Sequence, residues 1–79
     1  MAWRVVELDD RQWNVSVAVE RRAHSDRWNL VLSFRQQEGG TRPFWAEYPL
    51  SASSRSALLL QAEQIPNERL TAVLADLLR

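Results

Sequence analysis

The chain contains no cysteine and only one histidine, so two common ways of stabilising a small protein are missing. Without cysteine there are no disulfides, and a structural zinc site normally requires several thiolate or imidazole ligands. In a domain of 79 residues the hydrophobic gain and the conformational entropy nearly cancel. We therefore expect no metal and no cofactor, and we expect self-association as a homodimer to supply the missing stability.

Lysine is also absent, because all ten basic residues are arginine. This excludes Schiff-base chemistry, amine nucleophiles and the lysine of a phosphate-binding loop. Ten acidic side chains balance the ten arginines, so no overall field attracts nucleic acid or an anionic membrane. Nucleic-acid binding would require a local basic patch.

Long apolar runs are missing too: the longest, such as Ala57–Leu60, are far too short to span a bilayer. Residues Met1–Leu8 lack the apolar stretch of a secretion signal, so we expect a cytoplasmic protein with no membrane partner. The composition is that of a globular protein, without linkers or repeats. The sequence predicts a single α+β domain over residues 1–79.

Two segments alternate between apolar and polar residues, the pattern of a strand with one buried face. They are Trp13–Val19 and Trp28–Phe34, and the short polar stretch between them predicts an antiparallel hairpin with a tight turn at Ala23 and His24. The predicted register pairs Val19 with Trp28, Val17 with Leu30, Val15 with Leu32 and Trp13 with Phe34.

A first strand is predicted over residues 3–8, before a turn at Asp9 and Asp10. Two adjacent valines blur its alternation. The favoured facing places Trp3 and Val5 inside and leaves Val6 and Leu8 outside.

A fourth strand, Thr41–Tyr48, is predicted between the Gly39-Gly40 turn and Pro49, which ends it. Its facing follows from the cost of burying a carboxylate, because the alternative would bury Glu47. The inward residues are then Phe44, Ala46 and Tyr48. Trp45 lies on the outer face, and the aromatic residues assigned to the core are Trp13, Trp28 and Phe44.

From Ser51 onwards the apolar spacing becomes helical. Candidate N-caps are Ser51, Ser53 and Ser54, and Pro66 should end the first helix near Gln64. Its predicted buried stripe is Leu58, Ala62 and Ile65, widened by Leu59 and Leu60. A second helix, capped by Asn67, presents Leu70, Val73, Leu74 and Leu77.

This order of elements predicts an α+β fold: a four-stranded antiparallel meander sheet (β-β-β-β) followed by two C-terminal helices packed on one face. Two alternatives stay open for the helices, which pack either on their own sheet or on that of a second chain.

The segment His24, Ser25 and Asp26 has the residue types of a catalytic triad, but adjacent side chains point apart and local turn chemistry is favoured. A metal site would have to combine His24 with Asp26, Asp9 or Asp10, and no such pair has ligand spacing. Neither pattern indicates catalysis, and we expect no enzyme activity.

An exposed tryptophan is the strongest functional indication. If Trp45 lies outside beside Arg35 and near Arg22 and Arg42, it forms a semi-apolar binding surface on the outer sheet face. The leading interpretation is a small non-enzymatic binding or protein-interaction module that forms a homodimer through that face or an edge. The alternative is a single-stranded nucleic-acid-binding protein, since four strands followed by helix resemble the general plan of Whirly-type single-strand binders.

Overall fold

The computed structural model describes residues 3–39 and 42–79. The chain forms β1 (Arg4–Leu8), β2 (Arg11–Arg21), β3 (Trp28–Gln36), β4 (Phe44–Ala52), α1 (Arg55–Glu63) and α2 (Asn67–Leu77). The strands make one antiparallel sheet in the order β1-β2-β3-β4. The sequence-based prediction of a four-stranded antiparallel sheet followed by two helices is confirmed.

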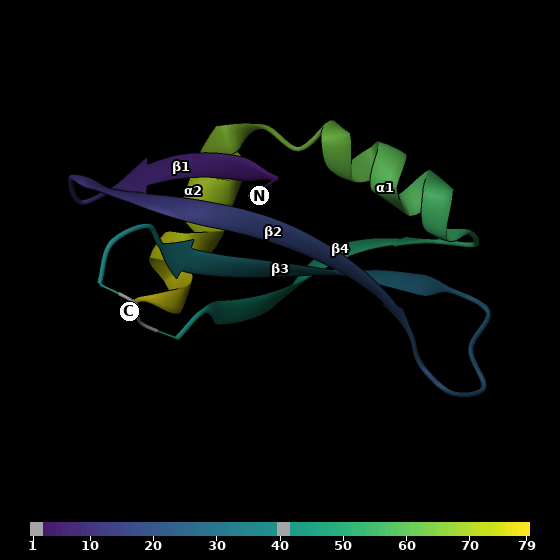
Figure 1. Ribbon diagram of the computed structural model, residues 1–79. Coiled ribbons are helices and arrows are strands. Elements are labelled where there is room, and N and C mark those ends of the chain that lie inside the picture. Colours follow the sequence, from purple (N-terminus) through teal and green to yellow (C-terminus); the bar gives the residue numbers. More distant parts are fainter. Residues whose placement is uncertain (1–2, 40–41) are drawn as a thin grey trace.

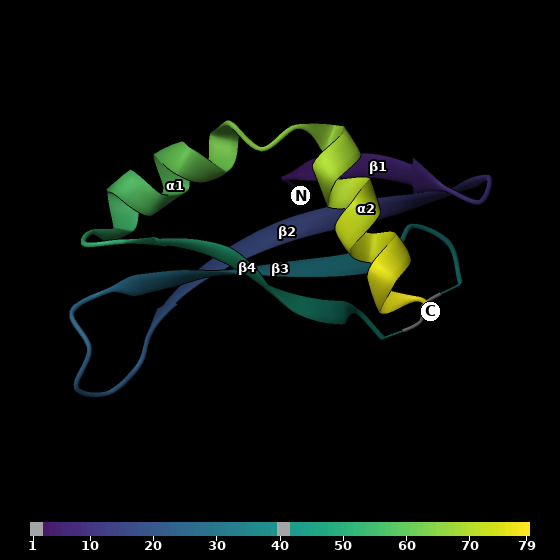
Figure 2. The same ribbon diagram turned by 180° about the vertical axis from the view of Figure 1, so that it is seen from behind.

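Both helices lie on the same side of the sheet. The strands pass in front of α2 in Figure 1 and behind it in Figure 2, and α1 lies beside α2 above the far end of β4. The core lies between the two layers, and its largest fully buried side chains come from both: Phe34, Leu30, Leu32 and Val15 from the sheet and Leu58, Leu70 and Leu74 from the helices. The helices therefore pack on their own sheet.

The hairpin between β2 and β3 has a different register from the predicted one. Val19 pairs with Leu30, Val17 with Leu32 and Val15 with Phe34, a shift of two residues. The predicted tight turn is instead a loop over residues 22–27, in which His24 has φ 66° and the Ser25 N–H donates to the Arg22 carbonyl at 3.1 Å. Because side chains alternate with period two, this shift leaves every inward residue facing inward.

The predicted inward position of Trp3 is confirmed, because Trp3 packs against the core. The predicted facing of Val5, Val6 and Leu8 in β1 is wrong. Val6 is buried and Leu8 packs against the core, whereas Val5 is 44% exposed on the outer face. The cause is the turn at Asp9 and Asp10, which have φ 55° and 62° and so form a two-residue hairpin turn with two positive φ angles. That turn pairs Leu8 with Arg11 and therefore Val6 with Trp13.

Pro49 does not end β4, which continues to Ala52. The register with β3 changes between Asn29 and Leu30, so Pro49 lies in an irregularity of an edge strand, where a missing N–H is tolerated. The predicted start of this strand at Thr41, and Gly40 in the turn before it, lie outside the described residues.

The three aromatic residues assigned to the core all lie on the inner face of the sheet, but they are not equally buried. Trp13 is buried, Trp28 is partly buried, and Phe44 is 39% exposed because it is the first residue of an edge strand. The Phe44 ring lies beside that of Trp13, with the ring centroids 6.0 Å apart.

The helices begin and end close to the predicted positions. Of the three candidate serines, Ser54 caps α1 and accepts a hydrogen bond from the Ala57 N–H at 3.2 Å. The predicted stripe of Leu58, Ala62 and Ile65 is buried. Asn67 is not a cap but the first residue of α2, after Pro66.

The predicted widening of the α1 stripe is wrong, because Leu59 and Leu60 are exposed. Only one side of this nine-residue helix faces the sheet, and these two leucines lie outside that side.

Arg4 ties β1 to the corner between the two helices. Its guanidinium donates to the carbonyl oxygens of Ile65, Glu63 (2.8 Å) and Ala62 (3.4 Å), and to Asn67 Oδ1 (3.2 Å). Ala62 and Glu63 end α1, and Ile65 follows its C-cap. The Ala62 carbonyl also accepts from the Ile65 N–H at 3.0 Å, so the guanidinium adds a charged donor at this helix end and complements the helix dipole. The guanidinium also stacks on Trp3, 4.3 Å from the ring centroid.

The corrected facing of β1 predicts opposite outcomes for two adjacent, identical substitutions. Val6→Thr places a hydroxyl in the core and should lower the free energy of unfolding by about 2 kcal/mol. Val5→Thr keeps the β-branched shape in solvent and should change it by less than about 0.5 kcal/mol. Urea denaturation of both variants tests this, and a larger loss for Val5→Thr would contradict the assignment.

The corner contacts predict that Arg4→Met lowers the free energy of unfolding by about 2–3 kcal/mol, since the carbonyls lose a charged donor while the aliphatic stem is kept. Arg4→Lys should lose less. Arg69→Met on the exposed side of α2 is the matched control and should stay within about 0.5 kcal/mol of wild type. Equal losses for the two Met variants would refute the role of Arg4.

Candidate functional site

The outer face of the sheet is the principal candidate surface, because both helices lie on the other side. Two large apolar side chains project from it: Trp45 of β4, which is 59% exposed, and Val5 of β1. The predicted outward position of Trp45 is confirmed. The two side chains come from opposite edge strands, so they are separate exposed groups and not one contiguous patch. A large exposed ring such as Trp45 is nevertheless a common anchor of contact surfaces.

A shallow hollow of about 450 Å³ lies beside the Trp45 ring. Trp45 is paired with Ser33, and Ser33 with Ser16, so two small hydroxyl side chains form the floor next to the indole. The lining residues are Asn14, Ser16, Val17, Ala18, Ser33, Arg35, Pro43 and Trp45. The small floor leaves one side of the ring open to a partner.

The four residues predicted for this site are only partly brought together. Arg35 lines the same hollow as Trp45. Arg22 instead forms an ion pair with Glu47 at 2.8 Å, two residues along β4 from the tryptophan. Arg42 is exposed but is not part of the hollow.

Val5 belongs to the outer face although its sequence pattern was interpreted as inward. The signal that identifies it is the pair of aspartates in the β1–β2 turn. A two-residue turn fixes the pairing of the flanking strands, and Val5 is thereby set opposite Asn14 on the outer face.

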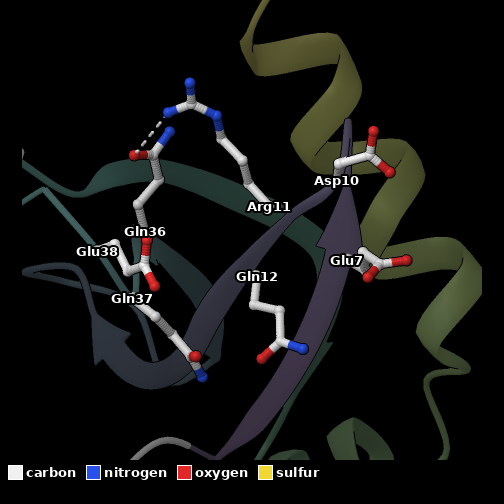
Figure 3. A pocket seen from close by; sticks show the side chains of 7 residues that line it. All are labelled: Glu7, Asp10, Arg11, Gln12, Gln36, Gln37 and Glu38. Carbon is white, nitrogen blue, oxygen red and sulfur yellow. Dashed lines mark hydrogen bonds between the residues drawn. The ribbon is translucent and has the colours of Figure 1, made fainter.

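A larger, polar hollow of about 650 Å³ lies at the end of the sheet near the β1–β2 turn. Figure 3 shows that Arg11 and Gln36 point toward one another across one rim, where the guanidinium donates to Gln36 Oε1 at 3.4 Å. The lining residues are Glu7, Asp10, Arg11, Gln12, Gln36, Gln37 and Glu38. They are amides and charged groups of both signs, without an aromatic surface.

A smaller hollow of about 270 Å³ lies near the same end. Its apolar walls are Leu8, Trp13, Phe44 and Leu78. Within residues 3–39 and 42–79 the buried Trp13 Nε1 has no hydrogen-bond acceptor.

The segment from His24 to Asp26 lies in the β2–β3 loop, and the predicted binding of local backbone by a side chain is confirmed for Ser25. Ser25 Oγ accepts a hydrogen bond from the Arg27 N–H at 3.2 Å, which occupies the hydroxyl with local backbone. Among the described residues, no three histidine or carboxylate side chains gather closely enough to share a metal ion.

The chain matches no protein-family model, no curated protein and no solved structure. Across residues 3–39 and 42–79, no helix has the length and apolarity required to cross a bilayer.

Proposed function

We propose that this protein is a non-enzymatic interaction module that forms a homodimer through the outer face of its sheet. The observation that carries the proposal is the exposed Trp45 ring on a sheet face that neither helix covers. Burying the exposed part of such a ring would contribute on the order of 3 kcal/mol to association. Dimer formation would also add to the stability of a small domain that has no disulfides.

The two edge strands of the sheet are poorly suited to pairing with a second chain, which favours the outer face as the dimer contact. Edge strands pair with a second chain most readily when they are long and regular. Here β1 has only five residues, and β4 contains Pro49 and a register irregularity. Both are features that limit edge-to-edge pairing.

The homodimer predicts that sedimentation velocity detects a monomer–dimer equilibrium between about 10 and 500 µM protein. Trp45→Ala should shift the dissociation constant upwards by about tenfold or more, because the variant loses the apolar anchor. Leu60→Ala is the control, since Leu60 is 70% exposed on α1, in the other layer. It should leave the equilibrium unchanged. A wild-type monomer throughout this range would refute the proposal.

Single-stranded nucleic-acid binding is the second candidate, favoured by the presence of Trp45 and Arg35 in one hollow. An exposed ring stacks on bases of any sequence, and a guanidinium without an ion pair within the described residues can neutralise a phosphate.

This candidate predicts that an oligothymidylate quenches tryptophan fluorescence at low salt, with an affinity that falls as salt is added. Trp45→Ala should abolish most of the quenching and Arg35→Gln should reduce the salt dependence, whereas Arg55→Gln on α1 should do neither. Unchanged fluorescence at low salt would eliminate nucleic-acid binding and leave the homodimer unaffected.

A further inference from the structure

The pairing of β2, β3 and β4 arranges the outer face in rows across the sheet. Ser16, Ser33 and Trp45 form one row, and Ala18, Val31 and Glu47 form the next. The rows on either side pair Asn14 with Arg35 and Glu20 with Asn29. On β2 and β3 the face therefore has small and apolar groups in its middle and one charged side chain paired with one amide at each end, whereas β4 adds Trp45 and the charged Glu47 to the middle rows.

A homodimer formed by stacking this face on itself has two simple arrangements, because its two-fold axis lies in the interface. The axis runs either along the strands, between β2 and β3, or across them, between the two middle rows. In the first, each β2 residue meets the partner's β3 residue of the same row. In the second, the order of the rows is inverted.

With the axis along the strands, the facing groups are compatible. Ala18 meets the partner's Val31, so apolar meets apolar. At the two ends, Arg35 meets the partner's Asn14 and Glu20 meets the partner's Asn29, so each charge faces an amide rather than a like charge. The axis across the strands also sets each of these charges on an amide, so this match does not distinguish the two axes.

The same arrangement brings only the start of β4 next to the start of the partner's β1, because Arg4 and Phe44 lie in one row and the two strands run from it in opposite directions. Val5, which is exposed, lies near that start. Val5 lies in the Asn14 row, one row from Trp45, which is about 7 Å along the strand. The indole spans that distance, so each of the two exposed apolar side chains on the face finds the other on the partner.

With the axis across the strands, Trp45 would instead meet the partner's Glu47. That carboxylate is bound to Arg22 at 2.8 Å, and both side chains are mostly solvated. Covering this ion pair with an indole would remove two charges from water without a new partner for either, which is unfavourable.

We infer that the two subunits are related by an axis along the strands, between β2 and β3, with Trp45 of each packed against the partner's Val5. This inference rests on the proposed homodimer. The overlapping parts are the nine paired residues of β2 and of β3, with Trp45 and Val5 beside them, or roughly 700 Å² in total, which is the size of a weak, transient contact. The dimer should therefore dissociate in the micromolar range or above.

Single-cysteine cross-linking distinguishes the two axes, because the native chain has no cysteine and each variant reports only the distance to its own copy. For Glu20→Cys the two Cβ atoms lie about 9 Å apart with the axis along the strands and over about 20 Å apart with the axis across them. For Glu47→Cys the two Cβ atoms lie about 16 Å apart with the axis along the strands and about 10 Å apart with the axis across them.

A short bismaleimide applied to the protein at dimeric concentration should therefore cross-link Glu20→Cys at least about tenfold faster than Glu47→Cys. Faster cross-linking of Glu47→Cys, or no cross-linking of either variant although sedimentation still detects their dimers, would overturn the inferred axis alone. Wild-type protein that sediments as a monomer would overturn the proposed homodimer itself.

Discussion

The contact on which this fold most depends is that of the Arg4 guanidinium with the corner between α1 and α2. Pro66 cannot continue the hydrogen-bond ladder of α1, so the last carbonyls of that helix need another donor. Arg4 supplies it, with bonds to the carbonyl oxygens of Ala62 and Glu63 and to that of Ile65 just beyond the helix. One side chain from the first strand thereby holds the junction of the two last elements, at a separation of about sixty residues along the chain.

This contact also determines what the other side of the sheet presents. Arg4 reaches the helices only if it faces inward, and period two then places Val6 inward and Val5 outward. Two short helices cover one face of a four-stranded sheet, and the described chain has no further element for the other. The exposed Trp45 and Val5 are thus consequences of one-sided packing, and the proposed second copy supplies the missing layer.

The sequence predicted most features that depend on period and few that depend on turns. The alternation of β2 and β3 predicted the inward residues, and the 3.6-residue period together with Pro66 predicted the stripe and end of α1. The facing of β1 was mistaken because Val5 and Val6 are equally apolar, although the aspartate turn contained the answer. Arg4 was not predicted as a helix partner because that contact joins opposite ends of the chain, which no local pattern encodes.

The β2–β3 loop determines which residues of β2 and β3 are paired, although it does not change which residues face inward. In the predicted register, Val31 would pair with Ser16 and Asn29 with Ala18, and the middle of the outer face would mix amides with apolar groups. The observed six-residue connection shifts the pairing by two, so that Ala18 lies opposite Val31 and Ser16 opposite Ser33. The exposure of Trp45 follows from the facing of β4 alone. The observed register adds that, across the line between β2 and β3, small polar residues pair with each other and apolar residues pair with each other. A two-fold axis along that line brings each such pair together again across the interface, so the loop that sets the register also sets the self-complementarity of the surface.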